Sequence, residues 1–384
     1  MNGLVRSLRR LLFAAGLLAL AGCGLFESKD GLTMAELFSF KPTVDVQQTW
    51  RYRMGDMGEG VLVPAVVGKS LFVANEAGDI ARLDDGRAVW RVSAGKAIFS
   101  GVASDGHLVV VGTRQGDVLA FSAQDGAFLW KARASSELLA PAVLTTHGVV
   151  VRSADNTVAL YAHQDGKRLW VYTRNNPSLA LRSYAPPVVL EPFVFVGFPG
   201  GKLTALNLQN GALAWEGAVA LPRGSTEIER VTDILASPWV DDQRACAVAY
   251  QGKVACFDVS NGGSTIWSRE FSSGQGVVLD NRYLFAVDER SAVHAFDREF
   301  GHPIWKNARF HLRQLSTPLV MPRRGFLVLG DAEGYVHLLD REIGQMAARV
   351  KTDGSAIVSP PQSIGHSSFV VQTRDGGVFA FEVQ

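Results

Sequence analysis

The sequence predicts an all-β fold: an eight-bladed β-propeller of four-stranded antiparallel blades, closed by pairing of the N- and C-terminal strands. Two observations carry this prediction. Tryptophan recurs with a step of about 40 to 45 residues, and each repeat contains four short runs of strand-forming residues. The composition agrees, because 47% hydrophobic and 20% charged residues indicate a chain with a packed core. A formal net charge of +1 lacks the basic excess of a nucleic-acid-binding protein.

Residues 1–22 have the pattern of an export signal. Three arginines precede an apolar stretch over 11–21, which is too short to span a hydrocarbon core of about 30 Å. The stretch ends in Leu-Ala-Gly-Cys at 20–23, which resembles the lipobox of bacterial lipoproteins. This resemblance implies that Cys23 becomes the lipidated N-terminus after cleavage, whereas the alternative is an ordinary cleavage site beside a chance cysteine. In lipoproteins of this kind an aspartate directly after the lipidated cysteine prevents sorting to the outer membrane. This chain has Gly24 there, which implies sorting to the outer membrane.

These features divide the chain into three parts. Residues 1–22 are the predicted signal peptide, 23–45 a lipidated tether and 46–384 the propeller. Removal of the signal peptide takes away three arginines and no acid, so the mature protein has a formal charge of −2. The rest of the chain has no long apolar run, so we expect it to reach the membrane only through its lipid anchor, on the periplasmic side.

The repeat is clearest at 116–130 and 201–215, where a β-strand pattern is followed by a Gly-containing turn and a tryptophan. A small residue in the strand comes before the turn. Small residues fit where blades pack, and the tryptophan supplies a large apolar plate against the neighbouring blade. We therefore interpret the tryptophan row as structural. The tryptophans of this slot are Trp50, Trp90, Trp130, Trp170, Trp215, Trp267 and Trp305, and Ala348 occupies the corresponding place in the next repeat.

The two ends of the chain complete the count. The last repeat stops at Gln384 without a turn or tryptophan, while Trp50 lies in an N-terminal strand with no preceding copy. Joining residues 46–54 to 355–384 makes one blade from both termini and removes an exposed sheet edge. Eight blades result.

The segment from Ala205 through Asn207 and Gly211 to Trp215 resembles the repeat of quinoprotein-type propellers. With a lipobox in front and a single propeller behind, the chain is similar to the BamB family of outer-membrane protein assembly lipoproteins. The segments 177–182 and 224–233 match stretches characteristic of that family. The resemblance implies a non-catalytic scaffold of the outer-membrane β-barrel assembly (BAM) complex, in contact with the periplasmic domains of BamA and with other BAM subunits. Unfolded outer-membrane proteins are further possible clients.

The same two segments stand out by length. The connection from Trp170 to Pro187 spans 17 residues and that from Trp215 to Pro238 spans 23, the two longest between blades, and they are consecutive. Since such connections leave the propeller on one face, we expect them to form one surface, suited to binding. The alternative is that they only fold back over the blades. The resemblance implies that Leu179, Leu181, Arg182 and Asp233 contact BamA, and the composition of the loops adds Glu227 and Arg230 to the candidate surface. Leu235 departs from the family pattern, in which that position is acidic.

An enzyme and a generic interaction propeller are the rival interpretations. Propeller dehydrogenases that use pyrroloquinoline quinone carry an adjacent Cys-Cys pair and Ca²⁺ ligands, and this chain has no Cys-Cys. Its eight histidines show no two-ligand zinc spacing. We therefore expect no cofactor, no metal and no catalysis. A generic propeller could bind other envelope partners, such as peptidoglycan or nascent outer-membrane proteins, for example by strand addition at its rim.

Cys246 and Cys256 flank a hairpin and are equidistant from Gln251, which would set them opposite one another. An oxidising compartment would allow a disulfide, but cross-strand geometry is often unfavourable for one. We expect two buried thiols.

Overall fold

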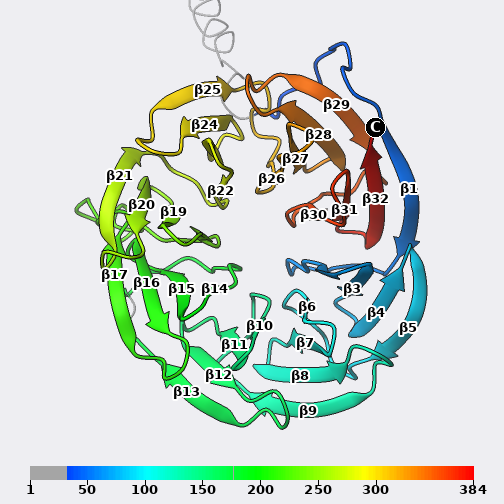
Figure 1. Ribbon diagram of the computed structural model, residues 1–384, viewed down its shortest axis with the longest axis vertical. Helices are drawn as coiled ribbons and strands as arrows, with labels where there is room; N and C mark the ends of the chain where they lie inside the picture. The colour runs from blue at the N-terminus through cyan, green and yellow to red at the C-terminus, as the bar shows by residue number, and fades with distance from the viewer. Residues whose placement is uncertain (1–32, 176) are drawn as a thin grey trace, which may run out of the picture.

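The computed structural model describes residues 33–175 and 177–384, and these ranges contain thirty-two β-strands and no α-helix. The strands form eight four-stranded antiparallel sheets arranged around a central axis (Figure 1). The predicted eight-bladed propeller is therefore confirmed. Within the described ranges, no helix has the length and apolar character that crossing a membrane requires.

Seven blades consist of strands that are consecutive in the chain, with the first strand nearest the axis and the fourth at the rim (Figure 1). Blade 1 contains β2 (Ala65–Val67), β3 (Ser70–Ala74), β4 (Asp79–Asp84) and β5 (Arg87–Ser93). Blade 2 contains β6 (Ala103–Ser104), β7 (Leu108–Gly112), β8 (Asp117–Ser122) and β9 (Phe128–Arg133). Blade 3 contains β10 (Val143–Thr145), β11 (Gly148–Arg152), β12 (Val158–Tyr161) and β13 (Arg168–Tyr172). Blade 4 contains β14 (Val188–Leu190), β15 (Phe193–Phe198), β16 (Lys202–Asn207) and β17 (Leu213–Ala218).

The remaining blades complete the ring. Blade 5 contains β18 (Trp239–Val240), β19 (Arg244–Val248), β20 (Lys253–Asp258) and β21 (Ser264–Glu270). Blade 6 contains β22 (Val278–Leu279), β23 (Tyr283–Val287), β24 (Val293–Asp297) and β25 (Pro303–Asn307). Blade 7 contains β26 (Leu319–Met321), β27 (Phe326–Gly330), β28 (Tyr335–Asp340) and β29 (Met346–Lys351). Blade 8 contains β30 (Gln362–Ser363), β31 (Ser368–Gln372), β32 (Gly377–Val383) and, from the N-terminal end, β1 (Val46–Arg53).

Blade 8 closes the ring as the sequence predicts. β1 pairs antiparallel with β32 from Val46 opposite Val383 to Arg53 opposite Gly377. The outermost strand of this blade therefore comes from one end of the chain and the other three strands from the other end. A single sheet binds both termini, so it removes two edges that would otherwise be open.

The tryptophan slot lies in the outermost strand of each blade, and in five of the eight blades it is directly opposite a small residue. Trp130, for example, pairs with Ala120 and packs on the turn of blade 3 at Gly166, where a Cβ would lie 2.5 Å from the indole. The Trp130 Nε1 also donates a hydrogen bond of 2.7 Å to the carbonyl oxygen of His163 in the same turn. Corresponding bonds to the next blade, at 2.8–3.1 Å, are donated by Trp90, Trp170, Trp267 and Trp305. The structural interpretation of the tryptophan row is confirmed.

Blade 7 carries Ala348 in this slot, and the closure of the ring explains why. The next blade has no turn between its two outer strands, because β32 and β1 belong to opposite ends of the chain. The chain entering β1 lies there instead. Val44 and Val46 pack in the same apolar cluster as Ala348, and the Thr43 N–H donates to the Ala347 carbonyl oxygen at 2.9 Å.

The described part of the predicted tether packs on the ring. The Ala35 N–H donates to the His311 carbonyl oxygen at 2.8 Å, and the Arg313 guanidinium donates to the Ala35 carbonyl oxygen at 2.8 Å. The guanidinium carbon of Arg349 lies 5.2 Å from the centre of the Phe38 ring, and the same guanidinium donates a hydrogen bond to the Phe38 carbonyl oxygen. A segment expected to act as a tether up to residue 45 is thus bound to blades 6 and 7 from Ala35 onward. Residues 1–32, with the signal peptide and Cys23, lie outside the described residues.

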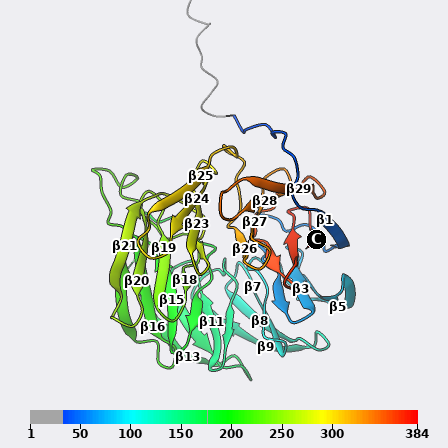
Figure 2. The ribbon, with the colours of Figure 1, turned by 45° about the horizontal axis from the view of Figure 1, so that its top comes forward.

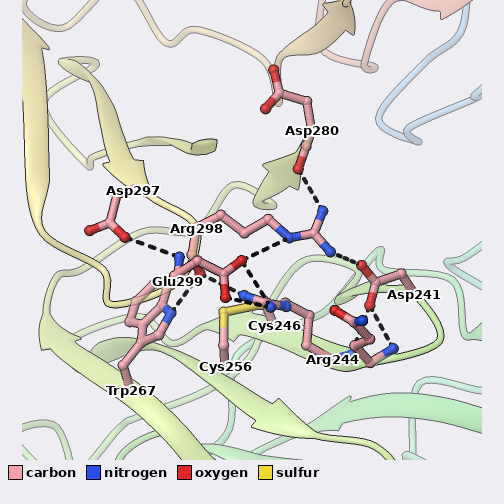
Figure 3. The surroundings of a disulfide bond; sticks show 10 residues. Asp241, Arg244, Cys246, Cys256, Trp267, Asp280, Asp297, Arg298 and Glu299 are labelled. Carbon is pink, nitrogen blue, oxygen red and sulfur yellow. Dashed lines mark hydrogen bonds and ion pairs between the residues drawn. A yellow bond between two sulfur atoms is a disulfide. The ribbon is translucent and has the colours of Figure 1, made fainter. Parts of the chain in front are cut away.

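The expectation of two free thiols is wrong, because Cys246 and Cys256 form a disulfide. Their residues are direct partners in the ladder between β19 and β20, with Cα atoms 4.1 Å apart, and both are fully buried. Figure 3 shows the bond beside Trp267. Cys256 lies on the middle strand, β20, and pairs with Cys246 of β19 on one side and with Trp267 of β21 on the other. The equal spacing about Gln251 did place the cysteines opposite one another, and only the bonding state was predicted wrongly.

Candidate functional site

The candidate site is built from two loops that join consecutive blades. The first long loop (residues 173–187, described apart from 176) joins β13 to β14, and the second long loop (residues 219–238) joins β17 to β18. Each loop runs from the rim strand of one blade to the innermost strand of the next. All such connections leave an antiparallel propeller on the same face. In the tilted view of Figure 2, green loops rise from the strand ends beside β21.

Hydrogen bonds join the two loops into one surface. The Leu181 N–H of the first loop donates to Asp233 Oδ2 of the second at 2.7 Å. The Ser178 hydroxyl donates to Glu227 Oε2 at 2.6 Å. Nearer the ring, the Ser183 hydroxyl donates to the Leu235 carbonyl oxygen at 3.2 Å. The prediction that the two longest connections form a neighbouring surface is confirmed.

Asp233 lies beneath this surface and not on it. Asp233 is 2% exposed, and its second carboxylate oxygen, Oδ1, accepts a hydrogen bond from the Gly200 N–H at 3.0 Å. Both carboxylate oxygens are therefore occupied by main-chain donors, one from the first long loop and one from the hairpin between β15 and β16. The sequence placed Asp233 among the surface charges. Its geometry instead suits a residue that holds the first long loop in position.

Arg152, at the end of β11, is a second buried support that the sequence reasoning missed. Its residue is 3% exposed, and its guanidinium donates to the Ser183 hydroxyl at 3.1 Å and to the Ala185 carbonyl oxygen at 3.4 Å. Burial lowers the pKa of Arg152 to about 10, and the negative charge of Asp233 opposes this shift. The side chain therefore remains charged at neutral pH. No sequence signal sets it apart, because it ends an ordinary strand of a regular blade.

The tip of the second long loop is a single turn with its own cap. The Glu229 N–H donates to the Thr226 hydroxyl at 3.3 Å, and Glu229 Oε2 accepts the Thr226 N–H at 3.1 Å. This reciprocal pair is a capping box, and the sequence Thr-x-x-Glu at 226–229 is its signature. Main-chain hydrogen bonds from Thr226 and Ser225 are the main reason that the pKa of Glu229 lies below its ordinary value.

The surface supported by this framework combines apolar and charged side chains. Leu179 and Leu181 are 40% and 39% exposed, and Ile228 on the capped turn is 72% exposed. Arg182 forms an ion pair of 3.4 Å with Glu137. Glu227 and Arg230 are exposed, as the sequence predicts. Ile228 and Leu221, also exposed, belong to the same surface but were not predicted as contacts. We call these exposed residues of the two long loops the loop surface.

The described part of the chain also has cavities away from the two long loops. A cavity of about 430 Å³ lies at blade 8 and is lined by Arg51, Tyr52, Arg53, Asp353 and neighbouring residues, but it involves neither long loop. Among the described residues, no group of three or more His, Cys, Asp or Glu side chains is arranged to hold a metal ion. The loop surface is therefore the candidate with the most specific architecture.

Comparisons with known proteins agree with the fold and with the length of the chain. A family model described as outer membrane protein assembly factor BamB matches residues 76–307. The outer membrane protein assembly factor BamB of Bordetella pertussis is 41% identical, over 97% of this chain and 96% of the relative. That of Pseudomonas aeruginosa is 40% identical, over 92% of this chain and 93% of the relative.

Solved structures give the same picture. The crystal structure of BamB from Moraxella catarrhalis superimposes with a TM-score of 0.81 at 28% identity, covering 88% of this chain and all of that one. A quinohemoprotein alcohol dehydrogenase from Comamonas testosteroni reaches a TM-score of 0.73 at 12% identity, covering 88% of this chain and 76% of the enzyme. At that identity the second likeness concerns the fold alone.

Proposed function

Because this chain belongs to the outer membrane protein assembly factor BamB family, we propose that it is a non-catalytic scaffold of the BAM complex that binds the periplasmic domains of BamA through the loop surface. The observation that carries the proposal is the pair of long loops, locked together by Asp233 and presenting exposed leucines beside charged groups. A partner contact with apolar anchors and a charged rim has this composition. Leu179, Leu181, Arg182, Glu227 and Arg230 make the contact, and Asp233 positions the first long loop.

The location of the protein follows from the same family membership. A factor in the assembly of outer-membrane proteins works at the outer membrane. We propose that Cys23 carries the lipid that anchors the mature chain there and that the ring faces the periplasm. Acyl chains contribute about 0.8 kcal/mol per buried CH₂, so several chains on one residue would give stable anchoring.

A quinone-dependent enzyme is the second candidate, supported by the shared fold alone. The curated relatives that match nearly the whole chain are named as assembly factors. The sequence also lacks the adjacent Cys-Cys pair of such enzymes. We therefore propose a protein that works by binding.

Co-purification of BamA with the full-length protein from gently solubilised membranes tests the proposal. Leu181→Asp and Arg182→Glu should each reduce the recovered BamA, because they place a charge on an apolar anchor and reverse a charge on the rim. Ile343→Asp is the matched control. Ile343 is 57% exposed but lies in the turn between β28 and β29, on the opposite face of the ring. Undiminished BamA with both loop variants, at unchanged circular dichroism, would refute the assignment of the surface.

A further inference from the structure

Residues 35–45 precede β1 and run along the outer side of blade 7, and we call them the strap. Figure 1 shows this part of the chain outside β29, from which it passes into β1. At one end the Ala35 N–H donates to the carbonyl oxygen of His311, in the connection between β25 and β26. That connection leaves the propeller on the face that carries the loop surface, as do all connections from a rim strand to the next innermost strand. At the other end the Asp45 carbonyl oxygen accepts a hydrogen bond from the Gln384 N–H at 3.0 Å. β1 is a rim strand and therefore begins on the opposite face, so the strap crosses blade 7 from one face to the other.

Two phenylalanines attach the strap to the ring. Phe38 and Phe40 are half-buried and pack against an apolar cluster of blades 6 and 7. The ring centres of Phe38 and the fully buried Phe310 lie 5.9 Å apart, in an edge-to-face arrangement. The guanidinium carbon of Arg309 lies 4.9 Å from the centre of the Phe38 ring, close enough for a cation–π interaction. Ser39, between the two phenylalanines, is exposed.

Two arginines bind the main chain of the strap. Arg313 is 2% exposed, donates to the Ala35 carbonyl oxygen at 2.8 Å and forms an ion pair of 2.8 Å with Asp331. Arg349 donates to the Phe38 carbonyl oxygen at 3.1 Å. Hydrogen bonds from charged donors are stronger than those between neutral groups. The strap is therefore held through its main chain as well as through its side chains.

Arg349 occupies the position that follows the tryptophan slot in β29, where other blades use a base to bind an acid. In blade 1 Arg91 pairs with Asp79 at 2.6 Å, and in blade 2 Lys131 pairs with Asp117 at 3.1 Å. Arg349 forms no ion pair with an acid in the described part of the chain, and its guanidinium lies beside the rings of the two phenylalanines of the strap instead. Blade 7 thus differs from these two blades in a way that suits binding of the strap.

The strap determines how much chain separates the ring from Cys23. Eleven residues, 24–34, lie between Cys23 and Ala35. An extended chain covers about 3.4 Å per residue, so a bound strap limits the distance from Cys23 to the ring to about 40 Å. A released strap would allow about 75 Å, measured to Asp45. Release would also move the point at which the chain leaves the ring to the face opposite the loop surface.

We propose that the strap sets the reach and the orientation of the ring relative to its lipid anchor, by making the chain leave the ring on the face that carries the loop surface. This inference rests on the proposed function, since it takes Cys23 to carry the anchor. A bound strap keeps the face with the loop surface, and not the opposite face, next to the anchored end of the chain.

Limited proteolysis of the full-length protein in detergent tests whether the strap is held as described. Endoproteinase Glu-C cleaves after glutamate, and Glu36 is an exposed residue of the strap. The release variant, Phe38→Ala with Phe40→Ala, should be cleaved after Glu36 at least tenfold faster than the wild type, as measured by mass spectrometry of the new N-terminus. Ser39→Ala is the matched control and should be cleaved at the wild-type rate. Equal rates in the release variant and the wild type, at unchanged circular dichroism, would overturn the proposal.

A series of deletions tests the reach. The chain between Gly24 and Ala35 is shortened stepwise, up to removal of residues 25–34, and BamA is co-purified after crosslinking in intact cells. With the wild-type strap the recovered BamA should fall at least fivefold by the longest deletion, which leaves a reach of about 7 Å. In the release variant the same deletions should be tolerated, because the released strap returns about 35 Å of chain. Full recovery with every deletion, or loss at the same deletion with and without release, would overturn the proposal.

Failure of this inference is distinguishable from failure of the proposed function. If the proposed function is wrong, the undeleted protein recovers no BamA, or Leu181→Asp recovers as much as the wild type. If only the inference is wrong, the undeleted protein recovers BamA and Leu181→Asp does not, but deletion and release of the strap have no opposing effects. The release variant without a deletion should recover BamA normally, since its loop surface is unchanged.

Discussion

The contacts between blades and the contacts between the two long loops differ in kind. Between blades one arrangement recurs around the ring, with a tryptophan packed on the glycine of the next turn and its Nε1 bound to a main-chain carbonyl. In the loops each contact occurs once, as with Asp233, which binds two N–H groups from different segments. The repeated contacts maintain the ring, and the unique ones shape the surface proposed for partner binding. The two regions should therefore respond differently to substitution.

The largest effect is expected at the tryptophan slot. Trp130→Ala removes the plate that packs on Gly166 and the 2.7 Å hydrogen bond to His163. A buried tryptophan replaced by alanine typically costs about 3–5 kcal/mol of the free energy of unfolding. Denaturant unfolding monitored by circular dichroism measures the loss. An unchanged midpoint would contradict the scaffold role of the slot.

A pair of glycine variants separates packing from backbone strain at the same interface. Gly166 has φ +69° and would place a Cβ 2.5 Å from Trp130, whereas Gly95 has φ +67° with open space around it. Both alanine variants incur the cost of the left-handed conformation, about 1–2 kcal/mol. Gly166→Ala should lose further stability because the indole must move. Equal losses in the two variants would show that the contact with the indole is not important.

The next largest effect on stability is expected from loss of the disulfide, which also stabilises the ring. Replacing Cys246 and Cys256 together by alanine opens a short hairpin loop, for which the chain-entropy relation gives about 2–3 kcal/mol. The variant should unfold at lower denaturant concentration while BamA recovery stays normal, because blade 5 holds the second long loop through the turn of this hairpin, where the Tyr250 N–H donates to the Asp233 carbonyl oxygen at 2.8 Å, and not through the cysteines. Thiol titration of the denatured, unreduced protein checks the premise and should find neither of these two cysteines free.

The features that the sequence predicts and those that it does not are also divided between repeated blade contacts and unique loop contacts. The blades, their closure by the two termini and the inward role of the tryptophans could be predicted, because each depends on a pattern repeated several times. Arg152, the burial of Asp233 and the packing of Phe38 on Arg349 could not, because each depends on one pairing between distant parts of the chain. The loops could be located by their length, but not the way in which they are held.

A smaller loss of stability is expected when Asp233, the buried residue that holds the first long loop, is replaced. Asp233→Asn removes a charge beside Arg152 and leaves either the Leu181 or the Gly200 N–H facing an amide donor. A buried donor without a partner costs about 1–3 kcal/mol. This variant should lose both stability and BamA recovery, unlike Leu181→Asp, which should lose recovery alone. Asp242→Asn, at an exposed position in the hairpin between β18 and β19, is the control. Normal BamA recovery with Asp233→Asn would show that this support is unnecessary for the surface.

The smallest effect on stability is expected at the capped turn of the second long loop. Thr226→Ala removes the acceptor of the Glu229 N–H, which typically costs about 0.5–1 kcal/mol at a helix-like N-terminus, and here the loss is confined to an exposed turn.

The hydrogen bonds of Glu229 in this turn also depend on pH. The pKa of Glu229 in the folded state lies below the ordinary 4.5, so the carboxylate stabilises the turn above pH 4.5, and this stabilisation is lost as the pH falls through the folded-state pKa. NMR of the Ser225 and Thr226 amides should therefore report loosening of the turn in acid while the amides of the blades remain unchanged. The same loosening in Glu229→Gln at neutral pH would assign it to this carboxylate, and an acid transition that persists in Glu229→Gln would assign it to another group.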